Sequence, residues 1–527
     1  MELLRCVPGR RGGKWLRRQW KSRSVFLLLN VLLVLLIRRL RRATVHPADL
    51  NREGDDPDLN FYAAVQHIKE AFDFMNNQKL GKPSQRRKPK PDELFYSTHA
   101  VAEHVCPYVT APRPSEGTDW PSFVSRDQEM YFFAAYLDRR LLGKGLVRVL
   151  AMSRRTVPRQ LFCLYGSVAV AASRVRAIWE RAWDPRTRFY QPFIVDCPVP
   201  SSPAADDSAA PHVVAVSIGR CPASPLEMSP PIPVRAHQGD PKGVQPNSVV
   251  VCVKGMDFLG DNSVRLLEWI EWQKLLGADK VHLYSYFVHP NTTRVIRFYE
   301  QQGFLQHSKL TLPGDQPSEP YQRSKYIWRN RQQKRRNEII PYNDCLYRHL
   351  YSHEFALIID VDEIVIPMRH SNWSAMLADL RKRLLADESA GPSPFTAFSI
   401  RNVFKFDSDD TNSSQPSYLH TLRTYRRSAK TSAVGEYGKS FMFLRNLVTV
   451  FNHFPMDKLR GAETLLKTQF VSQRDALKLH YKRSCPVESR AECDALLRLT
   501  TPDGSTDRFA GRLAGNVERT MSALGML

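Results

Sequence analysis

The stretch FALIIDVDEIVIP, residues 355–367, places three carboxylates inside an otherwise apolar run. An ionised carboxylate that leaves water without a partner costs several kcal/mol, so the acids need compensation. One interpretation is that Asp360 and Asp362 cap a turn at an exposed strand end. The other places them at the carboxyl edge of an open α/β sheet, where ligands bind. Period-two alternation would then put both on one side of the strand, where a divalent cation compensates them.

The net charge of +23 is concentrated at the amino terminus, where twelve basic residues and one Glu up to Arg42 account for +11 of it. Basic clusters flank an apolar stretch, residues 25–37, that is shorter than the usual span of about 20 residues. Flanking residues and arginines that reach the interface can extend it. The positive-inside rule predicts a cytosolic basic tail over 1–24 and an uncleaved transmembrane signal anchor over 25–40, in a type II orientation. A buried or interfacial amphipathic helix is the alternative.

Two features after this segment agree with a secretory lumen. Glycosylation sequons begin at Asn291, Asn372 and Asn412. Eight of the nine cysteines follow the anchor, and no Cys-x-x-Cys pair suggests zinc. Disulfides are therefore expected, with a connectivity that the spacing leaves open.

Composition divides the rest of the chain. Residues 41–94 are basic and proline-bearing, which is typical of a stem. Residues 95–235 carry short apolar runs between turns, which predicts a β-rich, sandwich-like domain, and 236–247 form a linker. Strand and helix patterns alternate over 248–490, which predicts an α/β domain with a mostly parallel twisted sheet. Residues 491–527 remain as a C-terminal tail.

Five segments of the α/β region resemble glycosyltransferase family 92, in the family's order. They are EWIEWQKLLGADKVHLYSY (268–286), NEIIPYNDCLYRH (337–349), the opening stretch, GKSFMFLRNLVTVFNHFP (438–455) and LKLHYKR (477–483). The resemblance covers residues 245–485 and departs from the family at 284–286, where relatives often carry Asp or Asn. It implies a GT-A fold and a Golgi enzyme with a lumenal catalytic domain. It also implies an inverting transfer from a UDP-sugar, UDP-galactose in characterised members, to a glycan or glycoprotein acceptor.

The family's motif also implies roles for individual residues. Asp362 would contact a Mn²⁺ or Mg²⁺ ion, and Asp360 would contact the ribose or a metal-bound water, with Glu363 behind them. The ion would neutralise the diphosphate leaving group. GT-A enzymes often add a late histidine as a metal ligand. His480 and His453 both fit, and His480 comes last in the chain.

An inverting transfer needs a carboxylate that deprotonates the acceptor hydroxyl. Asp407 and Glu436 are candidates for this base, because they follow the strand that carries the D-x-D motif, Asp360-Val361-Asp362, in the chain. Asp409 and Asp410 share that position. Solvated loop acids look the same in a sequence, so the choice stays open.

Lys439 lies in GEYGKS, which resembles half of a P-loop, but Ala433 stands where the first glycine is required. Lys439 is still expected to contact the donor diphosphate as a point charge. The basic, aromatic-bearing segment 321–336 would suit nucleic acid, but a lumenal location favours a solvated face near an anionic donor.

The sequence thus predicts a membrane-anchored hexosyltransferase without a nucleic-acid partner. Two rivals stay open. One is a catalytically silent family member that acts as a lectin-like or accessory protein. The other is a basic nucleic-acid-binding protein. The oligomeric state is not predicted.

Overall fold

The structure, a computed structural model, describes most of the chain after residue 101. The described residues are 102–107, 119–125, 128–140, 145–154, 160–178, 189–201, 211–236, 243–386, 395–406, 415–459, 467–482 and 490–527. The predicted cytosolic tail, signal anchor and stem lie outside these residues. None of the helices in the described part is long and apolar enough to cross a membrane.

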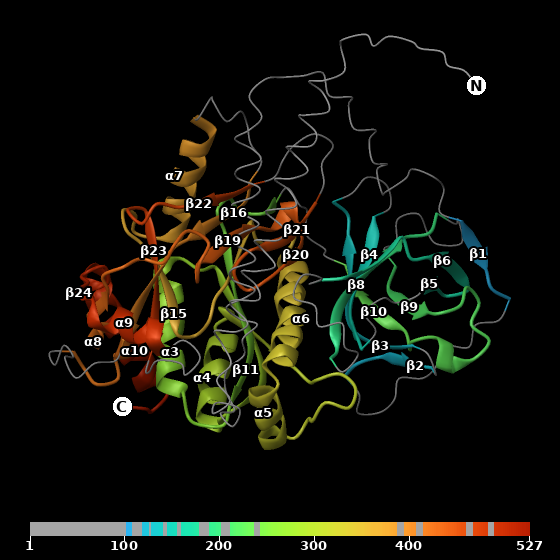
Figure 1. Cartoon of the computed structure of the whole chain (residues 1–527), viewed down its shortest axis with the longest axis horizontal. Helices are drawn as coiled ribbons and strands as arrows, with labels where there is room; N and C mark the ends of the chain where they lie inside the picture. The colour runs from blue at the N-terminus through green and yellow to red at the C-terminus, as the bar shows by residue number, and fades with distance from the viewer. Residues whose placement is uncertain are drawn as a thin grey trace, which may run out of the picture. The chain divides into compact units, whose positions relative to one another are not determined.

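The first domain is built from strands (Figure 1). They are β1 (Glu103–Val105), β2 (Ser122–Val124), β3 (Glu129–Asp138), β4 (Leu146–Ser153), β5 (Phe162–Tyr165), β6 (Val168–Ala171), β7 (Arg174–Ala177), β8 (Gln191–Pro198), β9 (Val213–Ser217) and β10 (Ile232–Arg235), with a 3-10 turn at Pro225–Glu227. The strands pair in the order β1-β6-β5-β9-β10-β3-β4-β8-β7, with β2 beside β3. A Cys163–Cys197 disulfide joins β5 to β8, which do not pair with each other. The sheet therefore curls on itself, and it buries Phe132, Val149 and Val170 in one core.

The second domain is a mixed α/β domain, as predicted. Its main sheet has the order β13-β12-β11-β14-β19-β16-β22. The strands are β11 (Val249–Phe258), β12 (Lys280–Val288), β13 (Leu305–Lys309), β14 (Phe355–Ile358), β16 (Phe395–Ile400), β19 (Lys439–Phe443) and β22 (Lys467–Phe470). Only β19 runs against the others of this sheet. The chain moves outward from β11 to β13 and then returns to β14 on the other side of β11. Ligands of open α/β sheets bind at such a reversal of strand order.

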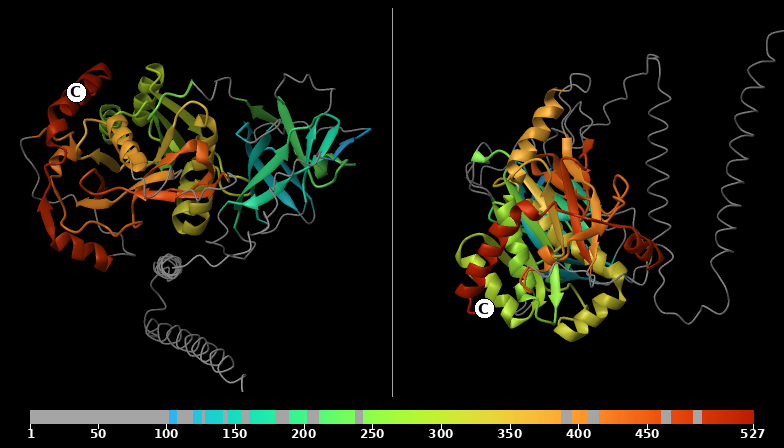
Figure 2. Two further views of the ribbon diagram at one scale, coloured as in Figure 1. Left: turned by 90° about the horizontal axis from the view of Figure 1, so that it is seen from above. Right: turned by 90° about the vertical axis from the view of Figure 1, so that its left-hand side faces the viewer.

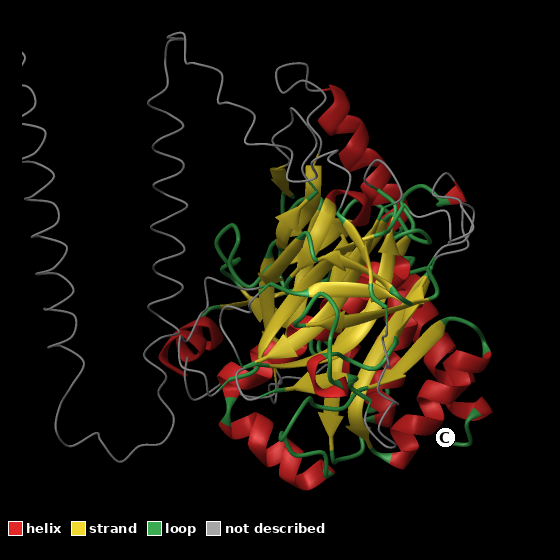
Figure 3. Cartoon of the chain, turned by 90° about the vertical axis from the view of Figure 1, so that its right-hand side faces the viewer, coloured by secondary structure: helices red, strands yellow, loops and turns green. Residues whose placement is uncertain are grey.

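Helices lie around the strands of this domain, in red in Figure 3. They are α3 (Ser263–Leu276), α4 (Pro290–Gln301), α5 (Pro320–Arg329), α6 (Arg331–His349), α7 (Trp373–Ala386), α8 (His420–Arg423), α9 (Arg490–Arg498) and α10 (Asp507–Ala523), with a 3-10 turn at Leu444–Asn446. Helix α3 ends at Gly277, whose φ of 96° allows its N–H to reach the carbonyls of the last turn. Helix α4 begins with Pro290, which needs no amide partner at that position.

A second, smaller sheet lies beside the first and has the order β15-β23-β17-β18-β24. Its strands are β15 (Glu363–Pro367), β17 (Asn402–Phe406), β18 (Arg426–Ser428), β23 (Ala476–Lys482) and β24 (Thr500–Pro502); β20 (Leu447–Val450) and β21 (Pro455–Lys458) form a separate hairpin. Residues 491–527 fold onto this domain, although the sequence analysis assigned them to a tail. Helix α10, which ends near the mark C in Figure 2, buries Phe509, Leu513 and Val517 in the same core as α3. The apolar residues of α10 recur at helical spacing, and this periodicity in the sequence indicates a packed helix where we predicted a tail.

One of the hydrophobic clusters contains residues of both domains. Tyr136 and Ile194 of the β-rich domain are buried in the same cluster as Ile340 and Leu346 of α6. The Tyr136 hydroxyl donates a hydrogen bond to the buried carboxylate of Asp344 on α6. The β-rich domain is therefore part of the scaffold that supports α6, and the predicted linker does not separate the two domains.

Arg140 completes this interface. Its guanidinium pairs with buried Asp138, 2.7 Å away, and donates to the carbonyls of Leu444, Arg445 and Leu447. We predict that Arg140→Ala lowers the free energy of unfolding by about 3 kcal/mol, because it leaves buried acceptors unpaired. Chemical denaturation of the full chain measures this loss. Arg139→Ala is the control. Because the neighbouring Arg139 side chain is exposed, its removal should change the free energy of unfolding by less than about 0.5 kcal/mol. Equal stabilities for the two variants would contradict the shared interface.

Candidate active site

The D-x-D segment is a turn between the two sheets. Strand β14 of the main sheet ends at Ile358, and β15 of the second sheet begins at Glu363. The Glu363 amide donates to the Asp360 carbonyl at 3.0 Å, which closes the turn. The prediction that strand alternation places Asp360 and Asp362 on one side is therefore wrong, because Val361 and Asp362 lie in the turn. Asp360 faces lysines of the main sheet, and Asp362 faces the second sheet.

Lysines from three distant strands compensate the buried acids. Asp360 lies 3.0 Å from the Nζ of Lys254 on β11 and 3.3 Å from that of Lys439 on β19. Glu363 lies 3.2 Å from Lys439 and 2.5 Å from Lys478 on β23. Burial alone would raise the pKa values of both acids. The charges of Lys254 and Lys439 instead hold the pKa of Asp360 well below its usual range, and Lys439 and Lys478 lower that of Glu363. Both acids are ionised at neutral pH.

Lys439 is fully buried beneath the turn. Besides the two acids, it donates a hydrogen bond to the side-chain carbonyl of Asn452. The lysine that reaches solvent beside Asp360 is Lys254, whose side chain is 29% exposed. Sequence reasoning missed Lys254, although a lysine near the end of the apolar strand SVVVCVKGM was a usable signal. Lys254 also lies 3.6 Å from Glu338 of α6.

Asp362 and His480 form a half-open pair on the second sheet. The Nε2 of His480 lies 3.2 Å from an oxygen of Asp362, and its Nδ1 lies 3.5 Å from Glu363. Lys482 lies 3.6 Å from the same Asp362 oxygen, and the Asp362 side chain is 44% exposed. Two protein ligands with solvent on one side fit a divalent cation that takes its other ligands from phosphates and water. Asp362 and His480 could therefore hold the predicted ion.

Asp360 and His453, which were predicted to lie at the metal site, instead face other protein groups. Both oxygens of Asp360 already face lysines. The Nδ1 of His453 donates to the Gly438 carbonyl at 2.7 Å, and its Nε2 lies 3.4 Å from the Asn452 amide nitrogen. Burial, with the charge of Lys439, lowers the pKa of His453 to about 3. His453 therefore supports the loop behind Lys439, and the structure does not bring it to Asp362.

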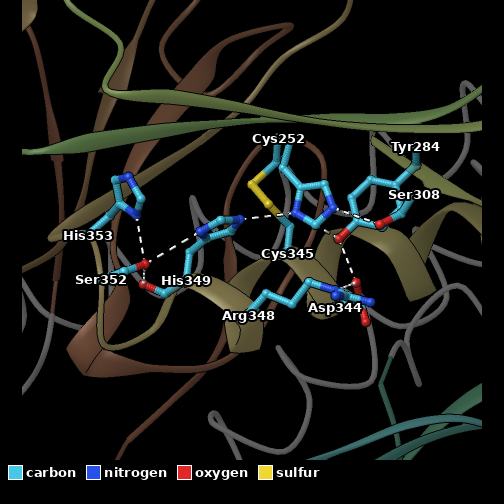
Figure 4. Close-up of a disulfide and its surroundings, with 10 residues drawn as sticks. Cys252, Tyr284, Ser308, Asp344, Cys345, Arg348, His349, Ser352 and His353 are labelled. Carbon is cyan, nitrogen blue, oxygen red and sulfur yellow. Dashed lines mark hydrogen bonds and ion pairs between the residues drawn. A yellow bond between two sulfur atoms is a disulfide. The ribbon is translucent and has the colours of Figure 1, made fainter. Parts of the chain in front are cut away.

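A second group of potential ligands comes from β12 and α6, next to the Cys252–Cys345 disulfide (Figure 4). Ligand atoms of His282, Cys345 and His349 come within 4.8 Å of one another, the one such trio among the described residues. Cys345, however, is bonded to Cys252 in a disulfide that joins α6 to β11. The two histidines face each other at 3.0 Å, and burial lowers the pKa of His282 to about 3. With the sulfur occupied, this cluster fixes β11 against α6 and does not offer three ligands.

The structure does not identify the catalytic base among the described residues. Asp407 lies outside the described residues, with Asp409 and Asp410. Glu436 closes a turn, because its carboxylate accepts a hydrogen bond from the Ala433 amide at 3.3 Å. Both Asp407 and Glu436 stay predictions.

Glu363 and Asp362 should contribute differently to the stability of the fold. We predict that Glu363→Ala lowers the free energy of unfolding by about 3–5 kcal/mol, because it leaves Lys439 and Lys478 buried with too few partners. Asp362→Ala is the matched change one residue earlier. It should cost less than about 1 kcal/mol, since the Asp362 side chain is half-exposed. Urea denaturation of both variants measures the difference, and similar losses would refute this assignment.

A further buried acid, Glu268 on α3, binds the short helix α8. It accepts hydrogen bonds from the amide and hydroxyl of Thr421, at 2.9 and 2.5 Å. Burial raises its pKa from 4.5 to about 7. The folded state therefore binds more protons than the unfolded state between these two values, so stability falls as pH rises through this window.

We predict that Glu268→Gln removes this loss. The variant should gain stability relative to the natural chain as pH rises from 4.5 to 7, by up to about 3 kcal/mol, because one pKa unit is about 1.4 kcal/mol. Denaturation curves at pH 5 and pH 8 measure the gain. A stability difference that is the same at both pH values would show that Glu268 does not titrate in this range.

The sequence of the α/β domain is similar to that of known glycosyltransferases. Residues 247–504 match the family model of glycosyltransferase family 92. The chain is 25% identical over 258 residues to glycosyltransferase family 92 protein F13G3.3 of Caenorhabditis elegans, covering 46% of this chain and 43% of that protein. It is 22% identical over 263 residues to beta-1,4-galactosyltransferase galt-1 of the same organism, covering 49% and 55%. The chain thus spans about half the length of these relatives.

Proposed function

Residues 247–504 belong to glycosyltransferase family 92, and on that premise we propose that this protein transfers a hexose from a UDP-sugar to a glycan acceptor. The observation that carries the proposal is the D-x-D turn at the reversal of strand order, with the half-open Asp362–His480 pair on one side and Lys254 on the other. Carboxylates, an imidazole and an ammonium group suit the binding of a metal-bound diphosphate.

In the proposed transfer, an acceptor hydroxyl oxygen attacks the anomeric carbon of the donor sugar. A new glycosidic bond forms, the bond from that carbon to the diphosphate breaks, and UDP leaves with the electron pair. The hydroxyl proton goes to a carboxylate, for which Asp407 and Glu436 are the candidates. A divalent cation held by Asp362 and His480, Mn²⁺ or Mg²⁺, would neutralise charge on the departing diphosphate. Lys254 would add a second positive charge from β11.

We further propose galactose as the hexose and the Golgi lumen as the location. Galactose rests on the implied family chemistry and on the printed activity of one relative, a beta-1,4-galactosyltransferase. Three disulfides, Cys106–Cys221, Cys163–Cys197 and Cys252–Cys345, support an oxidising compartment. The type II membrane anchor belongs to the same proposal. Asn291 is exposed at the start of α4, where a glycan can be attached, and glycosylation at Asn291 would support the lumenal location.

The test is sugar transfer by the full chain, with a panel of UDP-sugars, a mixed glycan acceptor, and Mn²⁺ or EDTA. We predict metal-dependent transfer from one donor, UDP-galactose. Asp362→Ala should lower this activity at least about 100-fold, because charge neutralisation by a bound cation contributes several kcal/mol. The control is Glu518→Ala, which removes an exposed acid on α10 and should leave activity unchanged.

The opposite outcome is also specific. A folded protein that binds donor or glycan but transfers no sugar would favour the catalytically silent, lectin-like alternative. Unfolding curves for each variant are needed, so that a loss of activity is not confused with a loss of folding.

A further inference from the structure

An aromatic row leads from solvent to the D-x-D turn. The ring of Tyr437 packs edge-to-face on Phe404, with centroids 5.8 Å apart, and Phe404 stacks on the imidazole of His480 at 5.4 Å. The Nε2 of His480 lies 3.2 Å from Asp362. Tyr437 at the outer end is 46% exposed. A solvent-accessible ring is thus connected to the candidate active site by direct contacts.

Strand register fixes the inner part of this row. Phe404 on β17 pairs with His480 on β23, and His480 pairs with Glu363 on β15. Paired residues of neighbouring strands lie on the same face of a sheet. A slip of one residue would turn Phe404 to the opposite face, so the strand register holds this ring beside His480.

The backbone holds Tyr437 in an uncommon conformation. Its φ of 50° lies in the left-handed region, which is costly for a bulky residue. The next residue, Gly438, has no room for a side chain, because a Cβ there would lie 2.6 Å from the Ile400 carbonyl. Lys439 then enters the buried ion cluster. The chain is therefore fixed just after Tyr437, and strain of this kind concentrates at ligand sites.

We propose that Tyr437 and Phe404 form the acceptor subsite, an aromatic platform on which an uncharged pyranose ring of the glycan stacks. The proposal rests on the proposed transferase function and names its acceptor side. A pyranose offers an apolar C–H face to aromatic rings, whereas its hydroxyls suit polar groups at the edge of such a platform. The donor diphosphate needs positive charge, which the partly exposed Lys254 would supply beside Asp360. Charged donor and neutral acceptor would thus meet at the D-x-D turn from different sides.

The test compares variants of Tyr437 in the full chain. Tyr437→Asn removes the ring but keeps a residue that tolerates the left-handed backbone. Tyr437→Phe keeps the ring, and Tyr321→Ala removes a tyrosine that is 64% exposed on α5. The probes are the methyl glycosides of β-galactose, α-fucose and β-N-acetylglucosamine. Saturation-transfer NMR measures their binding, transfer assays give KM for the active glycoside, and calorimetry gives the Kd of UDP with Mn²⁺.

We expect Tyr437→Asn to weaken glycoside binding and to raise the acceptor KM about tenfold, with the UDP Kd unchanged. Tyr437→Phe and Tyr321→Ala should stay within about twofold of the natural chain. A UDP Kd that rises with Tyr437→Asn would overturn the proposal, because the ring would then bind the nucleotide. Unchanged glycoside binding in Tyr437→Asn, or no glycoside binding by the natural chain, would overturn it as well.

The NMR measurement does not depend on turnover, so the two proposals can fail separately. If no UDP-sugar is transferred but glycoside binding is lost in Tyr437→Asn, the platform stands and the transferase function fails. If transfer occurs and the acceptor KM is insensitive to Tyr437, the function stands and the platform fails.

Discussion

The arrangement of the candidate site depends on one buried ionic interaction, the pairing of Glu363 with Lys439 and Lys478. Glu363 begins β15 at the point where the chain leaves the main sheet for the second sheet. Its carboxylate also accepts a hydrogen bond from the Asp360 amide at 3.1 Å, and its carbonyl accepts one from the Trp269 indole at 2.9 Å. With Glu363 fixed on both sides, the two preceding acids are presented at the reversal of strand order. The carboxylates inside the apolar run are thus compensated chiefly by lysines, and Asp362 is the acid of the three that keeps one side open to solvent.

This division explains why neighbouring acids have different expected roles. Glu363 and Lys439 have almost no contact with solvent, so their charges serve the fold. Asp362 has solvent on one side and an imidazole on the other. Asp360 lies between these extremes, held by one buried and one partly exposed lysine. A ligand that carries negative charge would meet Lys254 first, whereas a cation would meet Asp362.

Local patterns in the sequence predicted the strands and helices of the α/β domain but not the contacts between residues far apart in the chain. Helical and alternating periodicity indicated the βα units after Ser248, and three acids in an apolar strand marked the site. The lysines that compensate those acids come from positions 254, 439 and 478, and no local pattern connects residues so far apart in the chain. The turn at Val361 was missed because the apolar run continues through it, and the run gives no sign that the chain changes sheet. His453 looked equivalent to His480 by type and order. Only the fold shows that its nitrogens face Gly438 and Asn452.

We propose that the D-x-D turn binds a nucleoside diphosphate together with a divalent cation. Isothermal titration calorimetry of UDP into the full chain, once with Mn²⁺ and once with EDTA, tests it most directly, because it depends on neither the acceptor nor the transferred sugar. We expect saturable UDP binding with Mn²⁺ that weakens strongly in EDTA. Equal UDP binding in both conditions, or no binding in either by a folded protein, would contradict it.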